Sequence, residues 1–265
     1  MIQTKWKLML LVPSMALLHG CATQLSLPGT TAEGEAQVIS GPVLRFQSNA
    51  IAPAAILGRE ALEPGNILLT AEPTLISASI RLMTLAPVSH AAVYIGDGKL
   101  VDAMRQGVRI RELDHLLEEA RVVLVLRYPQ LTAQQAAVIA EYAANRSGAH
   151  FNFMGITLQA PFSIARRLCE LPLVSPLLRD ACIRGMGVLP RLAASESRVF
   201  CSQLVLLAYR HAGVQVTAAD PRLISPADIL HMREGDVPSV HIAKQLRYVG
   251  YLKHGEAMTS VAALH

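Results

Sequence analysis

A pair of apolar segments joined by a glycine-rich turn predicts a β-hairpin in the first half of the chain. Residues 91–95 and 100–104 each read as a strand, and Gly96-Asp97-Gly98 between them is a turn sequence. Two further runs also read as strands: residues 67–70, which follow a Pro-Gly pair, and residues 122–126, whose β-branched content is typical of a buried strand. These four segments predict a small antiparallel sheet.

Helices are predicted on both sides of a long insertion. Thr132 and Gln135 form a capping box at the start of an alanine-rich helix, and a second helix begins at Cys201 and runs to about His211. Between these helices, residues 151–195 carry apolar patches that predict short amphipathic helices, and we interpret them as an insertion. The order of the elements predicts an α+β domain in which a small antiparallel sheet packs on helices.

The composition fits one folded domain over residues 54–255. The chain has 265 residues, of which 52% are hydrophobic and 17% are charged, so intrinsic disorder is excluded. The net charge of +4 comes without a run of lysines and arginines and with only 5% aromatic residues, which argues against nucleic-acid binding. A short helix at 223–230 and a strand at 247–252 complete the predicted domain, and residues 256–265 form a tail.

The N-terminus has the pattern of an export signal that ends in a cysteine. Lys5 and Lys7 precede a mostly apolar run at 8–18, which is too short to cross a hydrocarbon core of roughly 30 Å as a helix. The sequence Leu-His-Gly-Cys that ends at Cys21 resembles the bacterial lipoprotein box. This resemblance implies that residues 1–20 are a lipoprotein signal peptide and that Cys21 is lipidated. The alternative is an ordinary signal peptide followed by a chance cysteine.

A lipid on Cys21 would make a membrane the first partner of this protein. Each buried CH₂ group of an acyl chain contributes about 0.8 kcal/mol to membrane binding, so several chains anchor a protein firmly. Residues 21–53 would then be the lipidated N-terminus and a tether. In Gram-negative lipoproteins an aspartate after the cysteine favours the inner membrane, whereas this chain has Ala22. The resemblance therefore implies a lipid-anchored protein of the cell envelope, on the outer membrane and facing the periplasm.

Three cysteines remain in the predicted domain. Cys169 and Cys182 both lie in the insertion, and a disulfide that closes a loop of that size contributes about 3 kcal/mol in the chain-entropy model. Two other arrangements stay open, in which both thiols are free or one of them pairs with Cys201. The sequence has no Cys-x-x-Cys or His-x-x-x-His spacing, so we predict no metal site and no cofactor.

Cys201, His90 and Asp102 are candidates for a catalytic triad. Cys201 lies at a predicted helix start, where the helix dipole and free amide groups stabilise a thiolate. A nucleophilic cysteine needs a neighbouring base, and His90, at the mouth of a strand, is the best placed of the nine histidines. Asp102 on the next strand could accept the second imidazole N–H and orient the ring. Each residue also has an ordinary reading, as a core cysteine, a core or surface histidine and a solvated aspartate.

The register of the hairpin decides whether such a triad can form. A two-residue turn at Asp97-Gly98 places Asp102 opposite Val93, and His90 then points to the other face of the sheet. A three-residue loop with a bulge places Asp102 opposite Ala92, so that His90 and Asp102 share one face as a diagonal pair. The glycines on both sides of Asp97 favour the second register.

Several short motifs follow one another in the order found in a known family. They are Leu62-Glu63-Pro64-Gly65-Asn66-Ile67, Ser89-His90-Ala91-Ala92-Val93-Tyr94, Val101-Asp102-Ala103, Phe200-Cys201-Ser202-Gln203 and Ser225-Pro226-Ala227-Asp228. This series resembles the permuted NlpC-like papain-fold cysteine hydrolases of the YaeF/YiiX group, and most of all the YaeF-like lipoproteins. In that family the histidine strand precedes the cysteine helix, which reverses the ordinary papain order.

The resemblance implies a circularly permuted papain-like fold and a role for each candidate residue. Cys201 would be the nucleophile, His90 the general base and acid, and Asp102 the orienting residue. Asn66 stands where relatives commonly have an aspartate, and Asp102 stands where they often have the longer glutamate.

The expected activity is cleavage of an amide bond, such as a cell-wall peptide bond, through a thioester on the cysteine. Two alternatives stay open. One is acyl transfer or hydrolysis of a lipid amide or ester, as in the lecithin:retinol acyltransferase-like enzymes, with the insertion lining an acyl pocket. The other is a catalytically silent envelope lipoprotein that binds a partner.

Overall fold

The computed structural model describes residues 22–26, 43–47, 55–84, 86–157, 162, 169, 174–186, 198–232 and 242–254. Cys21, the predicted lipidation site, and the predicted signal peptide at 1–20 lie outside the described residues. The chain divides into two units, residues 1–50 and residues 51–265. In the first unit, β1 (Ala22–Ser26) pairs antiparallel with β2 (Val43–Gln47), although the sequence analysis expected only a tether here.

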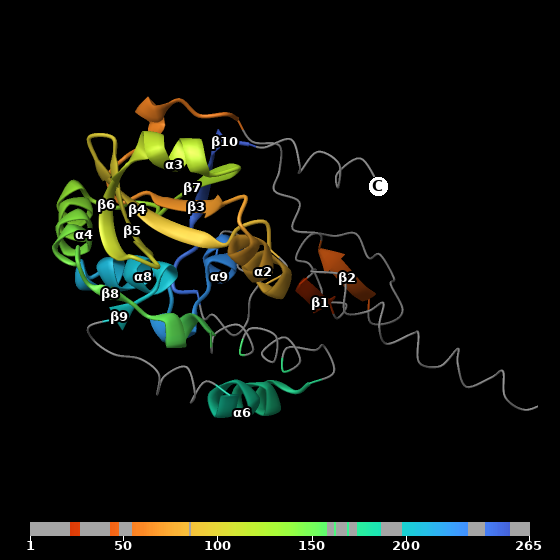
Figure 1. Cartoon of the computed structure of the whole chain (residues 1–265). Helices are drawn as coiled ribbons and strands as arrows, with labels where there is room; N and C mark the ends of the chain where they lie inside the picture. The colour runs from red at the N-terminus through yellow and green to blue at the C-terminus, as the bar shows by residue number, and fades with distance from the viewer. Residues whose placement is uncertain are drawn as a thin grey trace, which may run out of the picture. The chain divides into compact units, whose positions relative to one another are not determined.

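A six-stranded antiparallel sheet forms the centre of the second unit, in the order β10-β7-β3-β4-β5-β6 (Figure 1). Its strands, in chain order, are β3 (Ile67–Ala71), β4 (His90–Gly96), β5 (Lys99–Met104), β6 (Gly107–Glu112), β7 (Val122–Arg127) and β10 (Arg247–Lys253). All strands but the last come from one continuous stretch of chain. The predicted antiparallel sheet is therefore present and contains all five segments predicted as strands, including 247–252, whereas its sixth strand, β6, was not foreseen.

Helices cover both faces of the sheet (Figure 1). Helices α4 and α8 pack on one face and α3 covers the other. The helices are α2 (Leu75–Thr84), α3 (Leu113–Glu119), α4 (Ala133–Asn145), α6 (Pro176–Met186), α8 (Cys201–His211) and α9 (Pro226–His231), with short 3₁₀ turns at Arg59–Ala61 and Pro221–Leu223. Among the described residues, no helix is both long enough and apolar enough to span a bilayer.

The two sides of the core follow from the alternation of side chains along each strand. In β3, Ile67 and Leu69 pack in the cluster that contains α4 and α8, whereas Leu68 packs in the cluster that contains α3. All three side chains are fully buried. A strand that is covered on both faces reads as a continuous apolar run, which is why residues 67–70 and 122–126 could be recognised as strands from the sequence.

The hairpin combines features of the two predicted registers. Asp97 and Gly98 both have positive φ, at 50° and 69°, and form a two-residue turn between Gly96 and Lys99. A bulge before Gly96 then shifts the pairing, so that Asp102 lies opposite Ala92. The prediction of a three-residue loop was wrong, but the predicted register, with Asp102 opposite Ala92, is the one observed.

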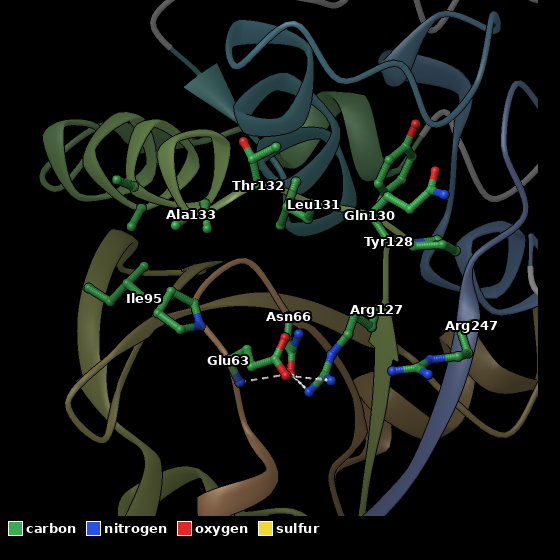
Figure 2. Close-up of a pocket in the computed structure, with 15 residues that line it drawn as sticks. Glu63, Asn66, Ile95, Arg127, Tyr128, Gln130, Leu131, Thr132, Ala133 and Arg247 are labelled. Carbon is green, nitrogen blue, oxygen red and sulfur yellow. Dashed lines mark hydrogen bonds and ion pairs between the residues drawn. The ribbon is translucent and has the colours of Figure 1, made fainter.

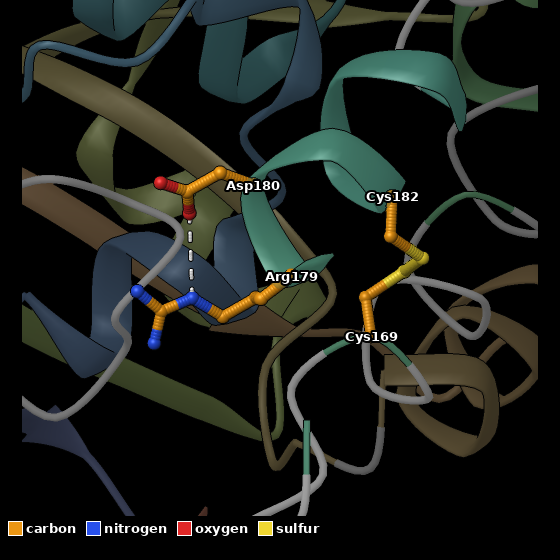
Figure 3. Close-up of a disulfide and its surroundings, with 4 residues drawn as sticks. All are labelled: Cys169, Arg179, Asp180 and Cys182. Atoms are coloured by element: carbon orange, nitrogen blue, oxygen red, sulfur yellow. Dashed lines mark hydrogen bonds and ion pairs between the residues drawn. A yellow bond between two sulfur atoms is a disulfide. The ribbon is translucent and has the colours of Figure 1, made fainter. Parts of the chain in front are cut away.

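The insertion contains α6 and a disulfide. The structure joins Cys169 to Cys182 of α6, with the two Cα atoms 5.9 Å apart (Figure 3). Asp180, which precedes Cys182 on α6, accepts a hydrogen bond from Arg179 at 3.4 Å. Because Cys201 is a free thiol, the alternative pairings that would have consumed it do not occur.

Candidate active site

Cys201 is the first residue of α8 and lies in the protein interior. The preceding Phe200 has extended φ and ψ angles of −110° and 171° and follows the short β9 segment (Arg198–Val199), which pairs with β8 (His150–Phe151). The chain therefore changes from extended to helical at the cysteine itself. Only 2% of Cys201 is exposed, and its thiol lies at the helix end where backbone N–H groups have no partner within the helix.

His90 is the first residue of β4, where the strand enters the sheet opposite Thr70. The preceding residue, Ser89, is held in place from α2, because its Oγ atom lies 2.6 Å from Oγ of Ser77. His90 is only 8% exposed. The imidazole is thus fixed at the end of the sheet, within reach of the start of α8.

Asp102 lies in the middle of β5 with its side chain completely buried. Its Oδ2 atom is 3.3 Å from Nε2 of His90, in the diagonal arrangement that the hairpin register allows. The same oxygen accepts a hydrogen bond of 3.1 Å from Nη1 of Arg111 on β6. The structure therefore brings His90 and Asp102 together, and it adds an arginine that the sequence analysis did not single out.

The electrostatics of the site favour a thiolate beside an imidazolium. Burial by itself raises the pKa of Cys201, but the positive charge and hydrogen bond of His90 and the backbone hydrogen bonds from Ala91 and Ser202 lower it below its usual value. Burial likewise lowers the pKa of His90, yet the adjacent Cys201 thiolate and Asp102 raise it to about 10. Each group of the pair stabilises the charged form of the other.

Asp102 stays ionised for a related reason. Burial raises the pKa of its carboxyl group, and this effect is outweighed by the hydrogen bond and charge of His90 and by the charge of Arg111, so the pKa lies below its usual value. With Nε2 of His90 bound to Asp102, Nδ1 is the ring nitrogen left for Cys201. The three side chains can therefore act together, with Cys201 as a nucleophile, His90 as a proton carrier and Asp102 as the carboxylate that orients the imidazole.

A cavity of about 770 Å³ lies at the other end of the sheet (Figure 2). Its walls include Asn66 before β3, Ile95 near the end of β4 and Arg127 at the end of β7. Arg127 binds Glu63 at 2.6 Å and donates a 3.2 Å hydrogen bond to Asn66, which ties the turn before β3 to β7. None of Cys201, His90 and Asp102 lines this cavity, so it is separate from the cysteine site.

An antiparallel sheet with a helix-starting cysteine beside a strand-starting histidine defines a papain-like protein in which the histidine strand comes first. The comparisons with known proteins agree. Residues 61–156 match the family described as permuted papain-like amidase enzyme, YaeF/YiiX, C92 family. The matched region includes His90 and Asp102 and ends before Cys201.

One relative is similar over nearly the whole chain. The probable lipoprotein peptidase YaeF of Escherichia coli (strain K12) is 33% identical over 252 residues, which cover 93% of this chain and 92% of that protein. The chain therefore belongs to the permuted papain-like amidase family of YaeF and YiiX. The predicted resemblance and the predicted α+β, permuted papain-like fold are confirmed.

Among solved structures, the metalloprotein yiiX from Escherichia coli O157:H7 aligns with 71% of this chain and 96% of its own, at 16% identity and a TM-score of 0.42. In the part of this chain that the structure describes, no three His, Cys, Asp or Glu side chains are grouped so that they could hold a metal ion.

Sequence reasoning missed two contributors to the site. Ser77 supports the residue before His90, but it lies on α2, a helix that was not predicted from the sequence. Arg111 binds Asp102 from a strand that was not predicted. A search for basic residues that alternate along the segment after the hairpin could have pointed to Arg111, but its partners, the buried Asp102 and the exposed Glu119, are visible only in the fold.

Proposed function

We propose that this protein is a membrane-anchored thiol hydrolase that cleaves an amide bond of the peptide type. The observation that carries the proposal is the buried Cys201 thiol at a helix start, hydrogen-bonded to an imidazole that is itself bound to Asp102. Membership in a family of papain-like amidases supports the reaction class. The name of the relative YaeF, a probable lipoprotein peptidase, supports both the substrate class and the lipid anchor.

The reaction would proceed in two steps through a thioester. In the first step the Cys201 thiolate attacks the amide carbonyl and forms a C–S bond, which gives a tetrahedral intermediate. The His90 imidazolium then protonates the leaving amine as the C–N bond breaks, and a thioester remains. In the second step neutral His90 removes a proton from water, the resulting hydroxide attacks the thioester carbonyl, and the thiolate leaves. Asp102 keeps the imidazole oriented in both steps.

The start of α8 would also stabilise the oxyanion of each tetrahedral intermediate. The backbone N–H of Cys201 is among the first N–H groups of the helix, which have no carbonyl partner within the helix. Such a donor is worth most in a buried site, where water does not compete.

The N-terminus would hold this activity at a membrane. The lipoprotein-box sequence at Cys21 and the name of the relative YaeF support a lipid anchor in the cell envelope. We propose the outer membrane with the domain facing the periplasm, where cell-wall peptides are within reach of a tethered hydrolase.

The first test is the reactivity of Cys201 with a thiol reagent between pH 5 and 8. A Cys21→Ser variant leaves Cys201 as the free thiol while Cys169 and Cys182 stay bridged, and labelled residues are mapped by mass spectrometry. We expect fast alkylation of Cys201 even at pH 6. In the His90→Ala variant the rate at pH 6 falls on the order of a hundredfold or more, because an unassisted thiol has a pKa of about 8.5.

A matched control and a substrate comparison complete the test. His115→Ala removes an exposed histidine of α3 and leaves the rate unchanged. An amide and an ester of the same acyl group then distinguish an amidase from an acyltransferase or lipid hydrolase. If Cys201 is inert, or if His90→Ala does not change its alkylation rate, the proposed hydrolase function is refuted. The alternative, a lipoprotein that binds a partner without catalysis, would then be favoured.

A further inference from the structure

Arg111 is a buried cation on an edge strand. Only 7% of its side chain is exposed, although β6 is the outermost strand beside β5. Nη1 donates a hydrogen bond of 3.1 Å to Oδ2 of Asp102, and Nη2 binds the carboxylate of Glu119 on α3. The guanidinium therefore joins the carboxylate of the site to the helix that covers that face of the sheet.

Asp102 depends on this arginine more than on its other basic neighbour. Its Oδ2 atom binds both His90 and Arg111. Its Oδ1 atom has no hydrogen-bond partner among the described residues. Nε of Arg109 lies 3.6 Å from this oxygen, on a side chain that is 37% exposed. A fully buried carboxylate without a permanent counter-charge is strongly destabilised.

The proposed reaction neutralises one of the two cations that are hydrogen-bonded to Asp102 in every cycle. When His90 gives its proton to the leaving amine, the imidazole becomes neutral and Asp102 loses its positive neighbour on that side. Arg111 cannot be deprotonated at any pH of interest, so it remains charged through both steps. Before the reaction, charges alternate along Cys201, His90, Asp102, Arg111 and Glu119, and the arginine is the member of this series whose positive charge does not change during the cycle.

We propose that Arg111 is a positioning residue that keeps Asp102 ionised and in place throughout the cycle, so that the proton of His90 passes to the leaving group and never to Asp102. This inference rests on the proposed thiol-hydrolase function. The two contacts also explain why this residue is an arginine and not a lysine. One planar guanidinium can bind Asp102 and Glu119 at the same time, whereas an ammonium is a single point charge.

The test measures alkylation of Cys201 against pH in variants of the full chain that carry Cys21→Ser. Arg111→Met and Arg111→Gln remove the charge, and the glutamine keeps a hydrogen-bond donor for Asp102 if the methionine variant does not fold. Arg111→Lys restores a charge. Arg210→Met is the matched control, because it removes an exposed arginine near the other end of α8.

We expect the lower limb of the alkylation profile to move to higher pH in both neutral variants. Loss of the cation beside Asp102 raises the pKa of that carboxyl group, and a protonated Asp102 no longer stabilises the His90 imidazolium that keeps Cys201 as a thiolate. The shift is at most about 1–3 pH units, the amount by which a neighbouring arginine lowers a carboxyl pKa. The lysine variant reverses part of the shift. Three other charged groups contact Asp102 or Arg111 and are unchanged in these variants: His90 on β4, Arg109 on β6 and Glu119 on α3.

The outcomes separate the inference from the proposed function. If the protein with Arg111 intact shows no fast alkylation at low pH, the proposed function fails. If it does, and the folded neutral variants keep the same lower limb, the role of Arg111 is refuted. Equal shifts in the neutral and lysine variants would also refute it, because the cause would then be packing and not charge.

Discussion

Replacement of Asp102 by asparagine should lower the pKa of His90 without changing the shape of the site. An asparagine side chain is isosteric with the aspartate, and this position is completely buried, so solvent cannot replace the lost charge. The variant Asp102→Asn removes the carboxylate that lies 3.3 Å from Nε2 of the imidazole. Arg111 keeps a counter-ion in Glu119, which limits the effect on folding.

The magnitude follows from the distance and the burial. An opposite charge within about 4–6 Å shifts a pKa by roughly 1–3 units, and one unit corresponds to about 1.4 kcal/mol. Burial lowers the pKa of His90, whereas the Cys201 thiolate and Asp102 raise it to about 10. Without the carboxylate, the imidazolium should lose its proton about 1–3 pH units earlier, although the Cys201 thiolate still stabilises it.

Alkylation by iodoacetate can detect this change. The reagent is an anion, so its reaction with a thiolate is helped by a neighbouring imidazolium, and the rate falls again at high pH when that imidazolium loses its proton. We expect a bell-shaped profile whose upper limb moves down in Asp102→Asn. Asp97→Asn is the control, because it makes the same substitution at the exposed turn of the same hairpin. An upper limb at the same pH in both variants would refute the assignment of Asp102 as the orienting carboxylate.

Two further predictions concern stability. Tyr209→Phe should lower the free energy of unfolding in urea by about 1–3 kcal/mol, because the buried hydroxyl of α8 donates a hydrogen bond to the Gly65 carbonyl before β3; an unchanged midpoint would contradict this. The double variant Cys169→Ser and Cys182→Ser should lose about 3 kcal/mol in the chain-entropy model while low-pH alkylation of Cys201 stays fast. A loss of that reactivity would show that the insertion supports the site.

The parts of the fold that could be predicted are those specified by local sequence. The capping box of Thr132 and Gln135 is present and α4 begins at Ala133, as expected. The strands buried on both faces were recognised because they are continuously apolar. The hairpin register was predicted correctly, but from a loop length that is wrong. The sequence reveals the glycines of the turn, whereas the bulge between Tyr94 and Gly96, which shifts the register, is visible only in the structure.

The missed parts depend on contacts between distant segments. In β6, alternation alone would bury Ile110 and expose Arg111, and the structure does the reverse: Ile110 is 46% exposed. The arginine turns inward because Asp102 and Glu119 lie on that side, at positions that no local pattern connects to it. The site residues themselves could be named from the sequence because each one lies at a recognisable boundary: a strand start, a strand after a turn, and a helix start.

The order of the elements along the chain has a consequence for when the cysteine becomes reactive. His90, Asp102, Arg111 and Glu119 all lie in the segment that also forms five of the six strands, whereas Cys201 arrives from a helix 111 positions after His90. In an unfolded or partly folded chain the thiol has no imidazole neighbour and keeps the reactivity of an ordinary cysteine. Fast alkylation at low pH is therefore a signal of completed long-range folding, and a newly synthesised chain would carry an unactivated thiol until α8 docks.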